Sequence, residues 1–244
     1  MTTLDGIYGK INDLNRELLG LGVERNLQLA RGGPKPVSLS SIRVPDGELA
    51  EKATKFAYDS EEESIFNHSM RTFFFGEIIG KDQYPDWHWD SETFYLSCIL
   101  HDVGLTTQRI DSSVLSFEYD GALEAHQFLM SNGCEKKSAD IVFEAIARHT
   151  DVYPLGKRTE GTLLSIGATL DIVGNHAPLI HEESLRDVVV KYPRLDVATK
   201  GAELLTYEVE KKNHQCHFKA FIDMGIPQAI LHNPLFAAYD KHEC

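Results

Sequence analysis

The sequence predicts an all-helical fold, on three observations. From Glu48 onward, apolar residues recur three and four positions apart, the spacing of one face of a helix. Signals for β-strands are few along the same stretch. The 244 residues, of which 42% are apolar and 25% charged, suit one large globular domain with a full core. We therefore expect an all-α helical bundle.

Residues 1–47 differ from the rest of the chain. A short helix is expected at 5–20, and residues 26–47 are rich in Gly, Pro and Ser, which favours an extended coil. The sequence thus predicts an irregular N-terminal extension over residues 1–47, packing on a helical domain that comprises residues 48–244.

Helical periodicity then defines the expected helices in order. Residues 137–148 illustrate the pattern, with apolar side chains at 139, 142, 143 and 146 and Ser138 expected as the cap. The expected helices are Glu48–Tyr58, Ile65–Gly80, Glu92–Val103, Glu118–Asn132, Lys137–Arg148, Thr162–Val173, Glu183–Lys191, Ala202–Lys212 and Phe218–Met224.

Charge and composition limit the classes of partner. The net charge of -13 disfavours binding to nucleic acid or to an anionic membrane. No run of about 18 apolar residues occurs, and the start MTTLDGIYGKINDLN does not read as a secretory signal. The four cysteines are sparse and form no CxxC motif, so no disulfide framework is expected. We expect a cytoplasmic protein, with association into a homo-oligomer left open.

The dipeptide His101-Asp102 carries the main chemical signal. It follows the apolar run FYLSCIL, so it is expected where the core meets a site. Adjacent residues lie about 100° apart on a helix, yet side chains of different length can reach one ion in a groove. An imidazole beside a carboxylate suits zinc, iron or manganese. Alone the dipeptide is weak evidence, because a capped helix end can look the same.

Two further residues strengthen the metal hypothesis. His68 lies upstream in NHSMR, and Asp171 lies downstream in the apolar run ATLDIVG. A carboxylate flanked by Leu170 and Ile172 needs a charge partner, since an unpaired buried charge is strongly disfavoured. A metal ion is the most economical partner. We therefore predict one divalent metal bound by His68, His101, Asp102 and Asp171.

This ordered set resembles the H…HD…D signature of HD-domain metalloenzymes, and the match is closer to the fungal cyanamide hydratases. The segments that carry the resemblance are FNHSMRTFFFG, CILHDVG, LSFEYDGA, EAIARHTDV, ATLDIVG and YPR, within residues 65–194. The resemblance implies a helical bundle, a single zinc ion (with Fe²⁺ as the other candidate) and hydration of the nitrile of cyanamide to urea.

The chain departs from that family at positions expected near the pocket. Val114 stands where the family carries a basic residue, Ile172 where it carries Asn, and residues 213–217 lack its Lys-Pro-Trp stretch. These changes leave the predicted metal ligands intact. They affect the pocket, so a small neutral substrate other than cyanamide is compatible with the sequence.

Three residues are candidates for catalysis, each with a simpler explanation. His149 in RHTD is expected beside the metal by the resemblance, although a cation at a helix end is common. Asp151 either orients His149 or caps the next turn. Glu118 contacts a substrate amine or only complements the helix dipole. Thr169 binds substrate or its own helix carbonyl. No role is expected for most other histidines, and His217 is a candidate for the pocket only.

Three functions compete. Hydration of a small neutral nitrile is favoured. An HD-type phosphohydrolase acting on a nucleotide is the second, but few cations lie near the motifs to clamp a phosphate. A non-catalytic HD-fold binding protein is the third, and the intact set of predicted ligands argues against it. No GxSxG, GxxxxGK[ST] or suitably placed GxGxxG motif occurs.

Overall fold

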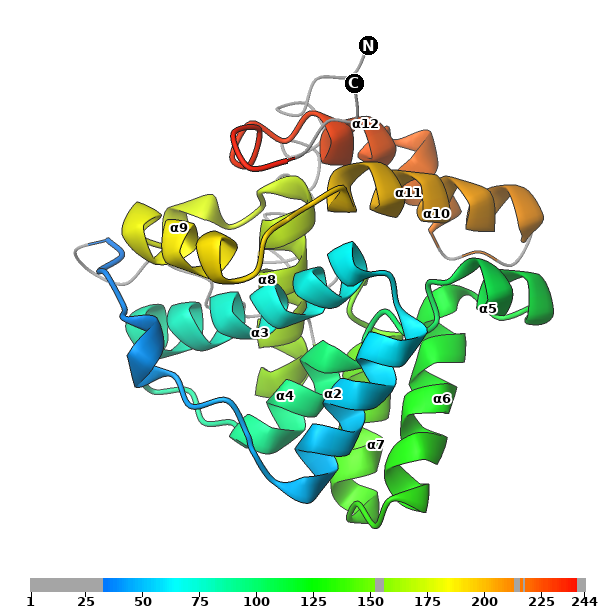
Figure 1. Cartoon of the computed structure of the whole chain (residues 1–244), viewed down its shortest axis with the longest axis horizontal. Helices are drawn as coiled ribbons and strands as arrows, with labels where there is room; N and C mark the ends of the chain where they lie inside the picture. Colours follow the sequence, from blue (N-terminus) through cyan, green and yellow to red (C-terminus); the bar gives the residue numbers. More distant parts are fainter. Residues whose placement is uncertain (1–32, 152–155, 213–215, 217, 241–244) are drawn as a thin grey trace.

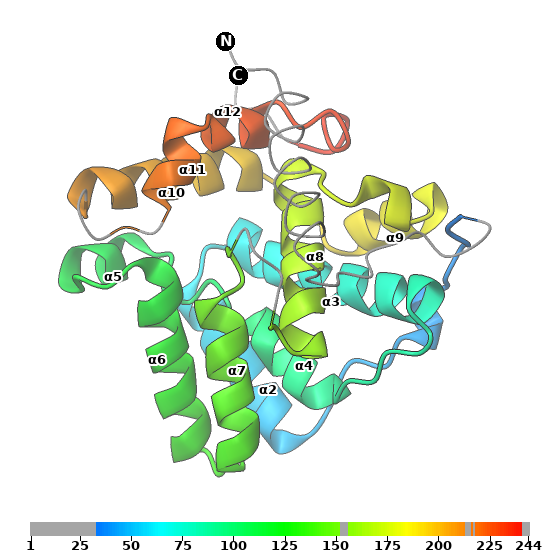
Figure 2. The same ribbon diagram turned by 180° about the vertical axis from the view of Figure 1, so that it is seen from behind.

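The computed structural model describes residues 33–151, 156–212, 216 and 218–240. Every regular element in these ranges is a helix (Figures 1 and 2), which confirms the all-helical prediction. The α-helices are α2 (Glu48–Ser60), α3 (Glu63–Gln83), α4 (Ser91–Ile99), α5 (Thr107–Ser112), α6 (Phe117–Ser131), α7 (Lys136–Ala147), α8 (Thr159–Val173), α9 (Glu182–Lys191), α10 (Val197–Lys211), α11 (Lys219–Asp223) and α12 (Ile226–Leu231); two short 3-10 turns are η1 (Leu39–Ser41) and η2 (Ala177–Leu179).

Helices α3 and α8 form the centre of the fold and make its most extensive contact. They cross closely because α8 has a glycine at the crossing point. A Cβ atom at Gly167 would lie 2.4 Å from the carbonyl oxygen of Thr72 on α3. Almost every residue of α3 from Ile65 to Gly80 is buried, including the aromatic run at 73–75, so this helix is the spine of the main core.

The remaining helices cover this pair from two sides. Helices α6 and α7 lie side by side as a hairpin, with α4 packed against α7 (Figure 2). Helices α10, α11 and α12 form a separate layer across the end of α8 (Figure 1). That layer has its own apolar cluster, and Leu105 and Phe117, which lie outside the three helices, belong to it as well. The described residues therefore contain two apolar clusters, one around α3 and α8 and one under α10–α12.

The described part of the N-terminal extension runs along the helical domain. The backbone N–H of Val37 donates to Ser184 Oγ at 2.8 Å, and that hydroxyl donates back to the carbonyl of Val37. The N–H of Lys35 donates to Asp82 at 2.9 Å. Residues 33–47 thus bridge α3 and α9. The helix expected at 5–20 lies outside the described residues, and the domain boundary at residue 47 stays a prediction.

Several predicted helix ends are corrected by the structure. The helix expected to reach Val103 ends at Ile99, so His101 and Asp102 lie in the turn that follows α4. Ser138 is inside α7, whose N-cap is Glu135, so the predicted cap is wrong. Helix α10 begins at Val197, five residues before the predicted start.

Helices α5 and α12 were not predicted. Each is six residues long, too short for apolar periodicity to appear. No helix among the described residues is long and apolar enough to cross a membrane. Within the same ranges Cys98, Cys134 and Cys216 are free thiols.

The glycine at the α3–α8 crossing gives a test of the packing. Gly167→Ala should lower the free energy of unfolding by about 1–3 kcal/mol, because the new methyl group meets main-chain atoms that cannot rotate away. Gly201→Ala is the matched control: it is also helical, and a methyl group added there would have no neighbour within 4 Å. That variant should gain roughly 0.5–1 kcal/mol from helix propensity. Guanidinium denaturation of both variants is the measurement, and equal stabilities would contradict the close crossing.

Candidate metal centre

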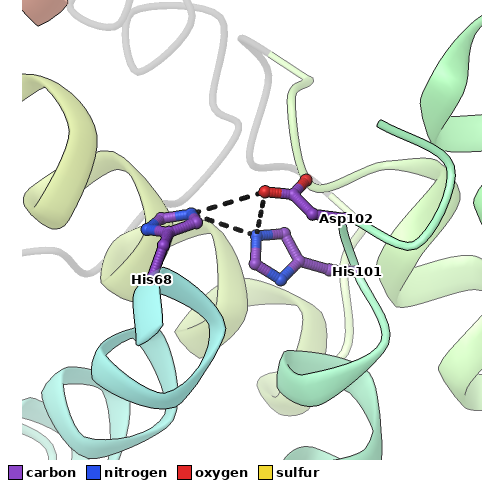
Figure 3. A group of neighbouring side chains, drawn as sticks. All are labelled: His68, His101 and Asp102. Atoms are coloured by element: carbon purple, nitrogen blue, oxygen red, sulfur yellow. Dashed lines mark hydrogen bonds and ion pairs between the residues drawn. The ribbon is translucent and has the colours of Figure 1, made fainter. Parts of the chain in front are cut away.

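Three side chains converge where the start of α3 meets the turn after α4 (Figure 3). His68 comes from α3, while His101 and Asp102 come from the turn, and all three are buried. The two Nε2 atoms lie 3.2 Å apart. Asp102 Oδ2 lies 3.7 Å from Nε2 of His68 and 3.3 Å from Nε2 of His101. Among the described residues this is the group whose potential ligand atoms lie within 4.8 Å of one another.

The turn that presents His101 and Asp102 lies directly on α6. A Cβ atom at Gly104 would be 2.2 Å from the carbonyl oxygen of Phe117 and 2.7 Å from the backbone nitrogen of Gly121. Only a residue without a side chain fits this approach. The glycine in the run HDVG therefore explains why the chain can leave α4 early and turn both ligand candidates toward α3.

The histidine tautomers make the three-residue group suited to a cation. His101 Nδ1 lies 2.7 Å from the carbonyl oxygen of Cys98, which can only accept a hydrogen bond. His68 Nδ1 lies 2.7 Å from a carboxylate oxygen of Asp171. A ring with one proton therefore carries it on Nδ1 in both residues, which leaves two Nε2 lone pairs facing each other beside a carboxylate. Without a cation between them, this arrangement is repulsive.

The separations fit a metal ion bound in the middle. Bonds of about 2.0–2.2 Å in tetrahedral geometry separate two ligand atoms by roughly 3.3–3.6 Å. The three measured separations, from 3.2 to 3.7 Å, lie at or near this range. Burial lowers the pKa of His101, although the charge of Asp102 opposes the shift, so its imidazole is available in the neutral form that binds metal. The residues present fit a divalent metal.

Asp171 is placed differently from the prediction. Its carboxylate accepts a hydrogen bond from His68 Nδ1, on the opposite edge of the ring from the Nε2 that faces the three-residue group. Arg71 donates to both of its oxygens at 2.8 Å, and Arg194 Nη1 donates to Oδ1 at 2.9 Å. Asp171 thus contacts the edge of His68 that points away from the three-residue group, the position of a residue that orients a ligand, and its predicted role as a fourth ligand stays a prediction. The sequence indicated that Asp171 needs a charge partner, and in the structure two buried arginines fill that role.

The clamp around Asp171 is fully buried and charge-balanced. Burial alone favours the neutral acid, but the charges of Arg71 and Arg194 outweigh it and hold the pKa of Asp171 well below its ordinary value. Arg194 also binds Asp240, and Arg71 Nη1 donates to the carbonyl oxygens of Tyr192 and Pro193. A histidine that donates its second nitrogen to a carboxylate is a common way of fixing a metal ligand.

His149 lies beside the group, at the end of α7. Its Nδ1 lies 2.7 Å from the carbonyl of Ile146, three residues earlier, as in His101. Its Nε2 is 3.9 Å from Asp102 Oδ1. Burial, and then the neighbouring His101, lower the pKa of His149 to about 3, so the imidazole is neutral and not a helix-end cation. Asp151 pairs with Arg148 at 3.0 Å, so the proposed orienting role of Asp151 is wrong.

The other two catalytic candidates have distinct positions. Glu118 is fully buried and accepts a hydrogen bond from Thr150 Oγ1 at 2.7 Å, and it is the Thr150 side chain that lines the cavity described below. Thr169 also lines the cavity, while its hydroxyl donates to the carbonyl of Ser165 in its own helix at 2.7 Å. Glu118 is therefore behind the cavity wall, and Thr169 presents a hydroxyl oxygen to it.

Sequence reasoning missed several residues of this region. Arg194 gave no signal beyond the YPR segment, and Thr150 gave none beyond the segment EAIARHTDV. Glu61 lies in the acidic run DSEEES, which looks like a solvated surface. Yet Glu61 is 9% exposed, and neither of its oxygens has a hydrogen-bond partner among the described residues. Burial, and then the charge of Asp102, raise the pKa of Glu61 well above its ordinary value.

A cavity of about 140 Å³ opens on the group. His68, His101, Asp102 and His149 form one end of it. The rest of its wall is mainly apolar and comes largely from the second apolar cluster under α10–α12. No lysine or arginine is among the described residues that line it. His214 and His217 lie outside the described residues.

The comparisons with known proteins agree with this geometry. A family profile described as "HD domain" matches residues 65–191, which contain the whole three-residue group. The chain belongs to the HD domain family. It is also 32% identical over 181 residues to the cyanamide hydratase DDI2 of Saccharomyces cerevisiae, covering 73% of this chain and 80% of that protein. Cyanamide hydratase DDI3 of the same yeast gives the same values. A divalent metal follows from the family and from the His-His-Asp group.

The geometry separates ligands from the residue that orients them. His101→Ala and Asp102→Ala should each leave the purified protein with little bound metal. Asp171→Asn should bind metal roughly 10- to 100-fold more weakly, the cost typical of losing the partner of a ligating histidine. Metal content and competition with a chelator are the measurements.

A matched control is Asp140→Asn, because Asp140 also binds a histidine, His126, at 2.9 Å but on the surface. It should not change metal affinity. If Asp171→Asn is well folded and as empty as Asp102→Ala, Asp171 is a ligand and the orienting role is wrong.

Proposed function

We propose that this protein is a metal-dependent hydro-lyase that adds water across the carbon–nitrogen triple bond of a small neutral nitrile, such as cyanamide. The observation that carries the proposal is the small cavity next to the His-His-Asp group, whose described lining residues include no lysine or arginine. The similarity to two yeast cyanamide hydratases supports the same reaction.

We propose zinc as the metal, held by His68, His101 and Asp102. Two imidazoles and one carboxylate are typical of a catalytic zinc site, which keeps a further position for water or substrate. When bound, the ion supplies Lewis acidity and lowers the pKa of water from 15.7 toward about 7. Fe²⁺ is compatible with the same donors.

The chain's own residues position the reactants and move protons. Asp171 holds the His68 ring in place, and the carbonyl of Cys98 does the same for His101. The neutral Nε2 of His149 faces Asp102 and can take a proton from water and return it to the nitrile nitrogen. Because the hydroxyl hydrogen of Thr169 goes to its own helix, its oxygen can accept an N–H from the substrate.

The reaction balances without any further reagent. The water oxygen bonds to the nitrile carbon, one water proton moves to the nitrogen, and the second follows on tautomerisation to the amide. Cyanamide and one water give urea. No oxidant, reductant or leaving group is involved, and the lining residues that the structure describes include no cysteine, serine or lysine to form a covalent intermediate.

A nucleotide fits this site poorly. A cavity of about 140 Å³ is smaller than the 300–1,000 Å³ usual for drug-sized ligands. A phosphate also needs cationic donors, and the described wall has none. The metal donors could serve phosphoryl chemistry in another setting, but the space and charge around them favour a small neutral molecule.

The first test is turnover. Zinc-loaded protein should convert cyanamide to urea, and the Asp102→Ala variant should not, with urea formation as the measurement. Release of phosphate from a nucleoside monophosphate, with no hydration of cyanamide or any other nitrile, would overturn the proposal and favour phosphohydrolase chemistry.

The second test concerns His149, which lies outside the group of three. His149→Ala should keep its metal and lose about two to four orders of magnitude in turnover, the usual contribution of acid–base catalysis. His126→Ala, on the exposed face of α6, is the control and should change neither quantity. A metal-free His149→Ala protein would show that His149 is a ligand, and a metal-loaded, fully active one would remove it from the mechanism.

A further inference from the structure

The cavity is larger and more apolar than cyanamide requires. Cyanamide has three non-hydrogen atoms and is polar at both ends. An apolar protein cavity of about 150 Å³ is known to hold benzene, which has six carbon atoms. The cavity here is close to that size, about 140 Å³. A molecule as small as cyanamide leaves roughly half of it unfilled.

The chemical character of the wall changes from one end to the other. The polar lining residues are the three-residue group, His149, Thr150, Thr169 and Asn175. Most of the remaining lining is hydrocarbon, and it includes Ile172, Val173, Leu205, Phe218, Phe221 and Ile230. These belong to the second apolar cluster, and the cavity is an unfilled space within it.

The apolar part of the cavity next to the metal-binding group indicates the chemical character of the part of the substrate that does not react. Water there makes few hydrogen bonds with the wall, so an apolar group displaces it favourably. A substituent that carries a charge or several polar atoms would leave them unpaired against Ile172 and Phe221. The wall therefore selects a compact hydrocarbon substituent.

We propose that the preferred substrate class is aliphatic nitriles whose substituent has about three to four carbon atoms, with the nitrile at the metal end and the hydrocarbon under α10–α12. This inference rests on the proposed hydratase function and specifies its substrate. The product is the corresponding amide, formed by the same addition of one water molecule.

The experiment is a homologous series. Turnover of acetonitrile, propanenitrile, butanenitrile, pentanenitrile and octanenitrile is measured beside cyanamide with zinc-loaded protein. Each buried methylene is worth about 0.8 kcal/mol, or roughly a fourfold change. From acetonitrile to pentanenitrile, kcat/KM should therefore rise on the order of fifty-fold, and it should fall for octanenitrile, which exceeds the cavity.

A second readout does not depend on turnover. Titration of the same nitriles into metal-free protein should show affinity that rises with chain length, with an increasingly negative heat-capacity change. Val173→Ala enlarges the apolar end and should move the optimum toward longer chains. Val190→Ala is the matched control, because Val190 is 70% exposed on α9 and lines no part of the cavity. That variant should keep the wild-type profile.

The outcomes separate the inference from the function on which it rests. If cyanamide is hydrated while kcat/KM stays flat or falls from acetonitrile onward, the hydratase stands and the substrate class is wrong. If neither cyanamide nor any nitrile is hydrated by metal-loaded protein, the hydratase function itself fails. An identical shift in the Val173→Ala and Val190→Ala variants also overturns the assignment of the apolar end.

Discussion

The buried clamp around Asp171 is the interaction on which the rest of the site depends. One carboxylate, with no exposure to solvent, joins α3 through His68 and Arg71, and joins the segment before α10 through Arg194. A charge at this depth is tolerable only because each lone pair meets a donor. The same contacts that satisfy Asp171 also fix which nitrogen of His68 faces the three-residue group.

The polar residues of the candidate metal centre lie next to the second apolar cluster, which supplies most of the cavity wall. The rings of His101 and His149 are each tied to a main-chain carbonyl three residues earlier, so little side-chain freedom remains. The apolar wall excludes water from one side and lowers the local dielectric constant, which strengthens the electrostatic interactions of the donors. A small site can therefore combine a strongly polar end with a hydrocarbon end.

Much of this architecture could be predicted from the sequence, because its long helices bury continuous faces. The helix of His68 and the helix of Asp171 were both expected on periodicity alone. The orientation of Asp171 could not be predicted, since the order H…HD…D says nothing of which arginines pack beside it. The exit of the chain after Ile99 depends on Gly104 fitting against α6, a contact between distant parts of the chain. The burial of Glu61 could not be predicted, because an acidic run in a sequence is typical of an exposed surface.

The link from Arg194 to Asp240 has a consequence for how the protein is made. Synthesis delivers His68, His101 and Asp102 well before Arg194 and Asp240. Until the turn that carries Asp240 docks, Arg194 has Asp171 but lacks its second carboxylate partner, so the arginine that holds Asp171 is itself less firmly positioned. The order of translation thus places the synthesis of Asp240 before the completion of the site. A nascent protein on the ribosome therefore contains the candidate metal ligands before it contains all the residues that orient them.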